Sequence, residues 1–225
     1  MSDNKNSYAG RLLRVDLTTG AINTQEFGPE FTELFIGGRG VASKILYDEV
    51  PPEVEPFDSN NRLIFSPGAL HGTGVPSASR TTVATRSPLT NMHGDGHAGA
   101  EWGGALKRAG YDVLIIQGRA EKPSYLFIEN DHVELRDASE LWGMLTSKSH
   151  AWLKEETGMK ELHTVCIGPA GENRVRLSGI FHNGADKGTS ARCGLGAVMG
   201  SKNLKAITTC GTKAVSYTHL RAHET

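Results

Sequence analysis

The chain has 225 residues, of which 38% are apolar and 22% are charged, the composition of an ordinary globular protein. Its 24 Lys and Arg balance 25 Asp and Glu, so no overall field recruits nucleic acid or an anionic membrane, and any anion site must be local. Because the apolar runs are too short to span a membrane and residues 1–6 are polar, unlike a secretory signal, we expect a cytoplasmic protein.

The N-terminal half predicts a hairpin, a helix interrupted by glycines, and short buried strands. The predicted elements are strands at 11–17 and 21–27, helical segments at 31–35 and 41–47, and strands at 62–66 and 80–85. A glycine- and histidine-rich loop at 92–99 is expected to lead into a helix at 100–108, which Gly110 would cap.

The C-terminal half predicts further strands around one longer helix. The predicted elements are strands at 112–117, 125–128, 133–136, 163–167, 174–181 and 205–209, and a helix at 146–157. Antiparallel hairpins with a few helices indicate an α+β fold rather than a regular βαβ alternation. We expect one domain over residues 8–213 and a non-native tail over 214–225, so the metal-like spacing of His219 and His223 is discounted.

The first glycine-rich loop carries Gly94, Asp95, Gly96, His97 and Gly99. A glycine-rich loop at the N-terminus of a helix directs backbone N–H groups outward, which would suit a phosphate. A tight turn that needs positive φ is an equal alternative. The side chains of Asp95, His97 and the preceding His93 could ligate a metal, although a supporting or surface role is the favoured interpretation.

The second glycine-rich loop, residues 183–200, has the same character, with Lys187 and Arg192 adding full charges to the backbone donors around Gly188 and Gly194. Its glycine spacing and surroundings do not fit a dinucleotide-binding fingerprint.

Two further arginines are candidates, and no catalytic group stands out. Arg80 follows a glycine-rich approach at the start of a predicted strand, and Arg39 lies in Gly37-Gly38-Arg39-Gly40 as a weaker candidate. Cys166, Cys193 and Cys210 are isolated, which argues against a disulfide framework or a complete zinc or iron–sulfur site. The residues therefore indicate a platform for a cofactor.

Several stretches together resemble the N-terminal domain of the aldehyde ferredoxin oxidoreductase family, over about residues 8–212. These are Gly10-Arg11-Leu12-Leu13-Arg14-Val15-Asp16-Leu17, Gly37-Gly38-Arg39-Gly40, Ala109-Gly110-Tyr111-Asp112, Ile167-Gly168-Pro169-Ala170-Gly171-Glu172-Asn173 and Gly196-Ala197-Val198-Met199-Gly200-Ser201-Lys202-Asn203-Leu204.

The resemblance implies a saddle of two antiparallel sheets with a few flanking helices, which carries a bis-molybdopterin (tungstopterin) cofactor holding tungsten or molybdenum. It implies that Arg80 contacts the pterin and that Gly99 belongs to the first of two loops that meet the pterin phosphates. It also implies that the backbone carbonyls of His97 and Thr189 bind a Mg²⁺ bridging these phosphates. Magnesium prefers such oxygen ligands. The family often has Arg where this chain has Gly188, so the second loop matches less closely.

The resemblance also implies parts that this sequence lacks. The family's 4Fe-4S cluster is held by cysteines of later C-terminal domains, and its acid/base residues also lie there. We therefore expect an N-terminal fragment, inactive alone, of an enzyme that oxidises aldehyde or oxo groups and passes electrons to ferredoxin or another iron–sulfur acceptor. A homodimer is left open.

Two other functions remain open at this stage. The chain could be a stand-alone phospholigand-binding module without redox activity, which would contain nucleotide but no metal. It could also be a structural β domain whose glycine turns bind nothing.

Overall fold

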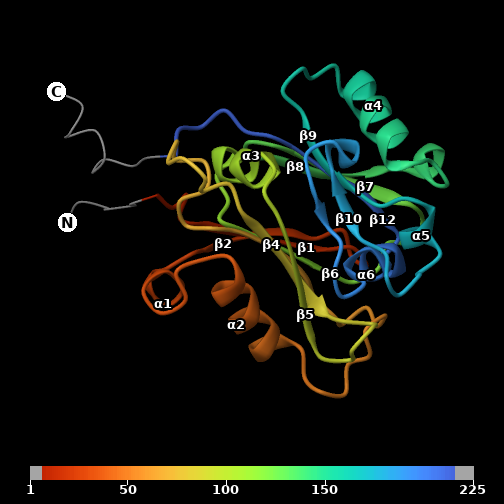
Figure 1. The fold of residues 1–225 in the computed structure, drawn as a ribbon, viewed down its shortest axis with the longest axis horizontal. Helices are drawn as coiled ribbons and strands as arrows, with labels where there is room; N and C mark the ends of the chain where they lie inside the picture. The colour runs from red at the N-terminus through yellow and green to blue at the C-terminus, as the bar shows by residue number, and fades with distance from the viewer. Residues whose placement is uncertain (1–6, 216–225) are drawn as a thin grey trace.

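The computed structural model describes residues 7–215, and the proposed tail beyond residue 215, with His219 and His223, lies outside the described residues. The described chain contains two six-stranded sheets packed face to face, with helices between and outside them (Figure 1).

The first sheet, sheet A, has the strand order β2-β1-β6-β3-β4-β5. Its strands are β1 (Arg11–Asp16), β2 (Ile22–Glu26), β3 (Leu63–Pro67), β4 (Thr81–Arg86), β5 (His93–Ala98) and β6 (Val113–Gln117). All neighbours are antiparallel except β1 and β6, which run parallel. Strand β5 therefore forms one edge of the sheet, and β2 forms the other.

The second sheet, sheet B, has the strand order β11-β10-β9-β12-β7-β8. Its strands are β7 (Ser124–Glu129), β8 (His132–Asp137), β9 (His163–Cys166), β10 (Ile180–His182), β11 (Thr189–Ser190) and β12 (Leu204–Cys210). Strands β12 and β7 are parallel, whereas the other neighbours are antiparallel. Strand β11 is an edge strand, and β12 lies near the centre.

The helices fill three layers around these sheets. They are α1 (Pro29–Thr32), α2 (Arg39–Glu49), α3 (Trp102–Ala109), α4 (Thr146–Thr157), α5 (Pro169–Glu172) and α6 (Leu195–Ser201), with 3₁₀ turns η1 (Ser139–Leu141) and η2 (Asn183–Ala185). No helix within residues 7–215 is both long and apolar enough to cross a membrane.

The layers follow from side-chain alternation along buried strands. In β6, Leu114 and Ile116 face the core between the sheets, where α3 and α6 also pack, while Val113 and Ile115 face α2. Helix α4 covers the outer face of sheet B through Leu153. Figure 1 shows α2 and α4 on opposite sides of the molecule.

The predicted α+β class with two sheets is confirmed, with one difference in strand direction. Each sheet is mixed rather than wholly antiparallel, because one parallel pair joins strands that are distant in the chain, β1 with β6 and β7 with β12. The hairpins and the helix at 146–157 agree with the sequence prediction, and Gly110 caps α3 with φ +106°.

Two local predictions are wrong. Residues 92–99 are not a loop that leads directly into a helix: they contain β5, and α3 begins only at Trp102. The predicted strand at 174–181 is reduced to β10 at its end, because residues 169–172 form α5 and turns follow it.

Candidate functional site

The two glycine-rich segments lie against each other where the edges of the sheets meet. A Cβ atom on Gly96 would lie 2.9 Å from Leu195 Cδ1 and 3.4 Å from the carbonyl carbon of Ser190, and one on Gly94 would lie 2.7 Å from Cys193 Cβ. Only glycine permits this approach. We call this region, residues 93–99 together with 188–194, the edge junction.

The backbone of His97 is directed away from its neighbouring strand. Ser87 N–H donates to Met92 O at 2.8 Å, so residues 87 and 92 are a hydrogen-bonded pair. Antiparallel pairs alternate between bonded and non-bonded, which makes Thr82 and His97 a non-bonded pair in the observed register. The carbonyl of His97 consequently points to the free edge of sheet A.

The same reasoning applies to Thr189 in β11. His182 N–H donates to Gly188 O at 3.0 Å, so the next pair, Phe181 and Thr189, is non-bonded. The Thr189 carbonyl therefore points to the free edge of sheet B. No backbone hydrogen bond joins β5 to β11 within the described part of the chain. Both carbonyl oxygens can therefore accept a hydrogen bond or coordinate a cation.

Arg80 immediately precedes β4, beside this junction. A Cβ on Gly99 would lie 3.3 Å from the carbonyl oxygen of Ser79, the residue before Arg80, and a Cβ on Gly188 would lie 3.9 Å from Gly99 N. Gly188 has φ +120° and Gly194 has φ +68°, backbone conformations that favour glycine. The first and second loops and Arg80 thus share one neighbourhood.

The three cationic candidates around the junction are exposed. Arg80, Lys187 and Arg192 form no salt bridge with any residue between 7 and 215. Lys187 also lines a cavity of about 300 Å³ together with Lys154 and His163. These three charges are therefore available to an anion.

The side chains of β5 that could have ligated a metal instead bind α2 and β4. His97 Nδ1 lies 3.0 Å from Thr82 Oγ1, and Arg39 hydrogen-bonds to both Asp95 and His97, its Nη2 lying 2.8 Å from His97 Nε2. His93 Nε2 lies 3.0 Å from Ser43 Oγ. Among the described residues, no group of three or more His, Cys, Asp or Glu is arranged to hold a metal ion.

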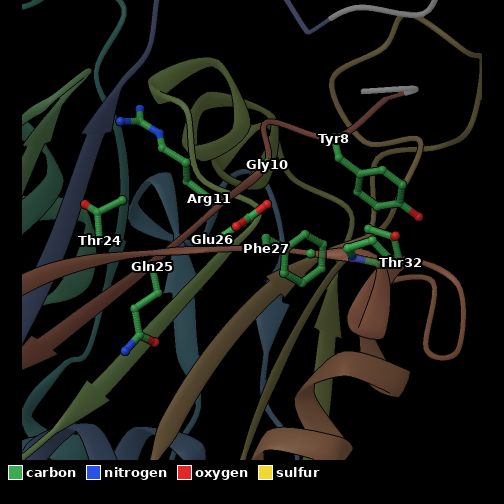
Figure 2. Close-up of a pocket in the computed structure, with 10 residues that line it drawn as sticks. Tyr8, Gly10, Arg11, Thr24, Gln25, Glu26, Phe27 and Thr32 are labelled. Atoms are coloured by element: carbon green, nitrogen blue, oxygen red, sulfur yellow. The ribbon is translucent and has the colours of Figure 1, made fainter. Parts of the chain in front are cut away.

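A larger cavity lies at the opposite edge of sheet A. It has a volume of about 520 Å³ and is lined by residues of β2 and the segments beside it, including Arg11, Glu26 and Phe27. Figure 2 shows these side chains around the cavity, which is separate from the edge junction.

Comparison with known proteins identifies the family. Residues 12–211 match the family described as aldehyde ferredoxin oxidoreductase, N-terminal domain. The tungsten-containing aldehyde ferredoxin oxidoreductases of Pyrococcus abyssi and Thermococcus kodakarensis are 46% and 44% identical to this chain over 92% of its length. The chain spans 34% of the length of each of these relatives.

A solved structure shares the fold. The active-site complex BamBC of benzoyl coenzyme A reductase, in complex with 1,5-dienoyl-CoA, contains a chain that matches with a TM-score of 0.91 and 43% identity, over 93% of this chain and 32% of that one. The protein therefore belongs to the aldehyde ferredoxin oxidoreductase family, and the matched region is the family's N-terminal domain.

Proposed function

We propose that the edge junction binds the phosphates of a bis-pterin cofactor that carries tungsten or molybdenum. The observation that carries this proposal is the juxtaposition of two glycine-rich edges whose carbonyls, at His97 and Thr189, both point away from their own sheets. Carbonyl oxygens at two adjoining free edges, together with phosphate oxygens and water, form the hard oxygen set that Mg²⁺ prefers.

The remaining candidates have complementary roles in this proposal. Arg80, Lys187 and Arg192 would pair with the phosphates, because charge-assisted hydrogen bonds from Arg and Lys to phosphate are stronger than bonds between neutral groups. The glycines at 94, 96, 99, 188 and 194 allow the two backbones to approach each other closely. They would also leave room for the cofactor to reach these backbones. Asp95 would hold Arg39 rather than touch the cofactor.

The proposed activity belongs to the longer protein. When bound, the metal would supply the two-electron oxidation of an aldehyde or oxo group. We propose that the part of the protein matching the rest of its relatives holds the 4Fe-4S cluster, the catalytic acid/base groups and the docking site for ferredoxin or a similar acceptor. Residues 7–215 would contribute the platform that binds and orients the cofactor.

The test uses magnesium pyrophosphate as a probe of the phosphate site. We expect it to shift the backbone amide NMR signals of Gly99, Gly188 and their neighbours in the ¹⁵N-labelled chain. The double variant R80A/K187A should weaken binding by roughly tenfold or more, since each charge-assisted hydrogen bond contributes about 1.5–3 kcal/mol. Lys148→Ala, an exposed lysine on α4, serves as the matched control.

Two results would overturn the proposal. The probe could shift amides elsewhere and leave the edge junction unchanged, or the double variant could bind as tightly as the wild type. Metal and pterin analysis of the purified chain adds a second readout, because a metal-free protein that retains a nucleotide would instead support a phospholigand-binding module.

A further inference from the structure

A group of buried polar side chains lies in the apolar core beneath the edge junction. His71, Trp102 and His182 are at most 1% exposed, and each has one ring nitrogen without a hydrogen-bond partner among residues 7–215. These nitrogens are Nε2 of His71, Nε1 of Trp102 and Nδ1 of His182. Because unpaired buried donors and acceptors are costly, each of these nitrogens calls for a partner.

The three side chains surround the first turn of α3. The rings of Trp102 and His182 meet edge to face, with centroids 6.5 Å apart. A Cβ on the next residue, Gly103, would lie 2.8 Å from His71 Nδ1, so His71 packs against the same turn. His71 is also near enough to His182 to contribute to lowering the pKa of its imidazole.

The other nitrogen of each imidazole connects this group to the edge junction. His71 Nδ1 lies 3.3 Å from Thr81 Oγ1, and Thr81 follows Arg80 in sheet A. His182 Nε2 lies 3.4 Å from Ser190 Oγ, and Ser190 follows Thr189 in sheet B. The buried histidines thus contact Thr81, which pairs with Ala98 of the edge junction, and Ser190, which belongs to the junction.

The chemistry of the free nitrogens matches water. Burial lowers the pKa of both histidines to about 4, so each ring is neutral at pH 7 and has one N–H and one lone pair. Trp102 adds a donor only. A buried water typically makes about three hydrogen bonds, as donor and acceptor, to such otherwise unpaired groups.

We propose that ordered water binds between His71, Trp102 and His182 and bridges sheet A to sheet B beneath the edge junction. The water thereby sets the distance between β4, at Thr81, and β11, at Ser190. This site is independent of the cofactor and exists in the chain whether or not the junction binds phosphate.

The direct test detects the water by NMR. In the ¹⁵N-tryptophan-labelled chain, the indole N–H proton of Trp102 should show a nuclear Overhauser effect to water with the sign of a long-lived, bound molecule. The partly exposed Trp152 should show only the signature of fast surface water. A Trp102 indole proton with no such cross-peak to water overturns the proposal.

A second test replaces the nitrogen without changing the shape of the ring. Substituting Trp102 by 3-benzothienylalanine puts sulfur in place of the N–H, which removes one partner of the water. We expect a lower midpoint of urea unfolding than the wild type has, and no change for the same substitution at Trp152. A dry site gives the opposite result, because removing an unpaired buried donor leaves stability unchanged or raises it.

Discussion

Nη2 of Arg39 lies 2.8 Å from Nε2 of His97, so the first turn of α2 holds a residue of the edge strand β5. The same guanidinium is paired with Asp95, and Thr82 binds the other ring nitrogen of His97. His97 Nε2 also lies 3.1 Å from Asp95 Oδ2, so these side chains form one connected cluster. Arg39 and Thr82 therefore hold β5 where its carbonyl at residue 97 faces the junction.

Arg39→Ala tests whether this support matters to the proposed phosphate site. We expect roughly tenfold weaker binding of magnesium pyrophosphate, measured by calorimetry, because losing the group that orients a ligand-bearing residue typically costs 10–100-fold in affinity. The control is Lys44→Ala on the same helix, whose pair with Asp48 is exposed. Equal affinities for the two variants would remove Arg39 from any positioning role.

Gly188→Ala tests the backbone conformation of the second loop. Gly188 has φ +120° with no atom nearer than 3.9 Å to an added Cβ, so alanine costs backbone strain, about 1–2 kcal/mol, rather than a clash. Gly143 has φ +89° with nothing within 4 Å, and is a matched control remote from the junction. Thermal unfolding should show a similar loss of stability for both variants, and only Gly188→Ala should weaken pyrophosphate binding.

Lys202, at the end of α6, binds three backbone carbonyls in the segments that adjoin β3 and β6. Its Nζ donates to Asn61 O at 2.7 Å, to Gly118 O at 3.1 Å and to Ser59 O at 3.2 Å, with the side chain almost fully buried. Lys202→Met would leave these acceptors unpaired, at a cost of about 1–3 kcal/mol for each buried group that finds no water. Urea unfolding at pH 6, where the ammonium keeps the three N–H groups that these carbonyls accept, measures the loss, and a variant as stable as the wild type would contradict it.

The same lysine predicts a pH dependence. Burial lowers the pKa of Lys202 to about 7 from 10.5, so between these values the unfolded chain binds more protons than the folded chain. Stability from this residue is therefore least below pH 7 and grows with rising pH, by at most about 1.4 kcal/mol per unit. The stability difference between wild type and Lys202→Met should widen from pH 7 towards 10, and a constant difference would contradict it.

Cysteine reactivity should follow burial. Burial raises the pKa of the Cys166 thiol to about 12, whereas Cys193 is partly exposed. We expect iodoacetamide at pH 8 to modify Cys166 at least about a hundredfold more slowly than Cys193 in the folded chain, because the thiolate is the nucleophile. Mass spectrometry of timed samples measures both rates. Equal modification rates of the two thiols in the folded chain, before urea is added, would disprove the prediction.

The sequence predicts local structure better than the approach of distant segments. The β1–β2 and β7–β8 hairpins and α4 follow from patterns within a few residues, and Asn130 adopts φ +51° at the predicted turn of the second hairpin. By contrast, the parallel pairing of β1 with β6 joins Leu12 to Val113. Nothing in either segment alone specifies that partner.

Strand β5 shows why the site itself was only half predictable. Glycine disfavours strands, so Gly94 and Gly96 indicated a loop, yet in the fold they give β11 and Leu195 room to pack. Residue types identified both glycine-rich segments as candidates. The hydrogen bond between Arg39 and His97 spans 58 residues and needs the completed fold.

The central position of β12 has a consequence for how the chain folds during its synthesis. Strand β12 lies between β9 and β7 in sheet B, although it is the last of the strands within residues 7–215. While a ribosome has yet to deliver Leu204–Cys210, β7 and β9 have no partner on their facing edges and the underside of α3 stays uncovered. We expect nascent chains to complete sheet A first and to need protection from aggregation until this strand emerges.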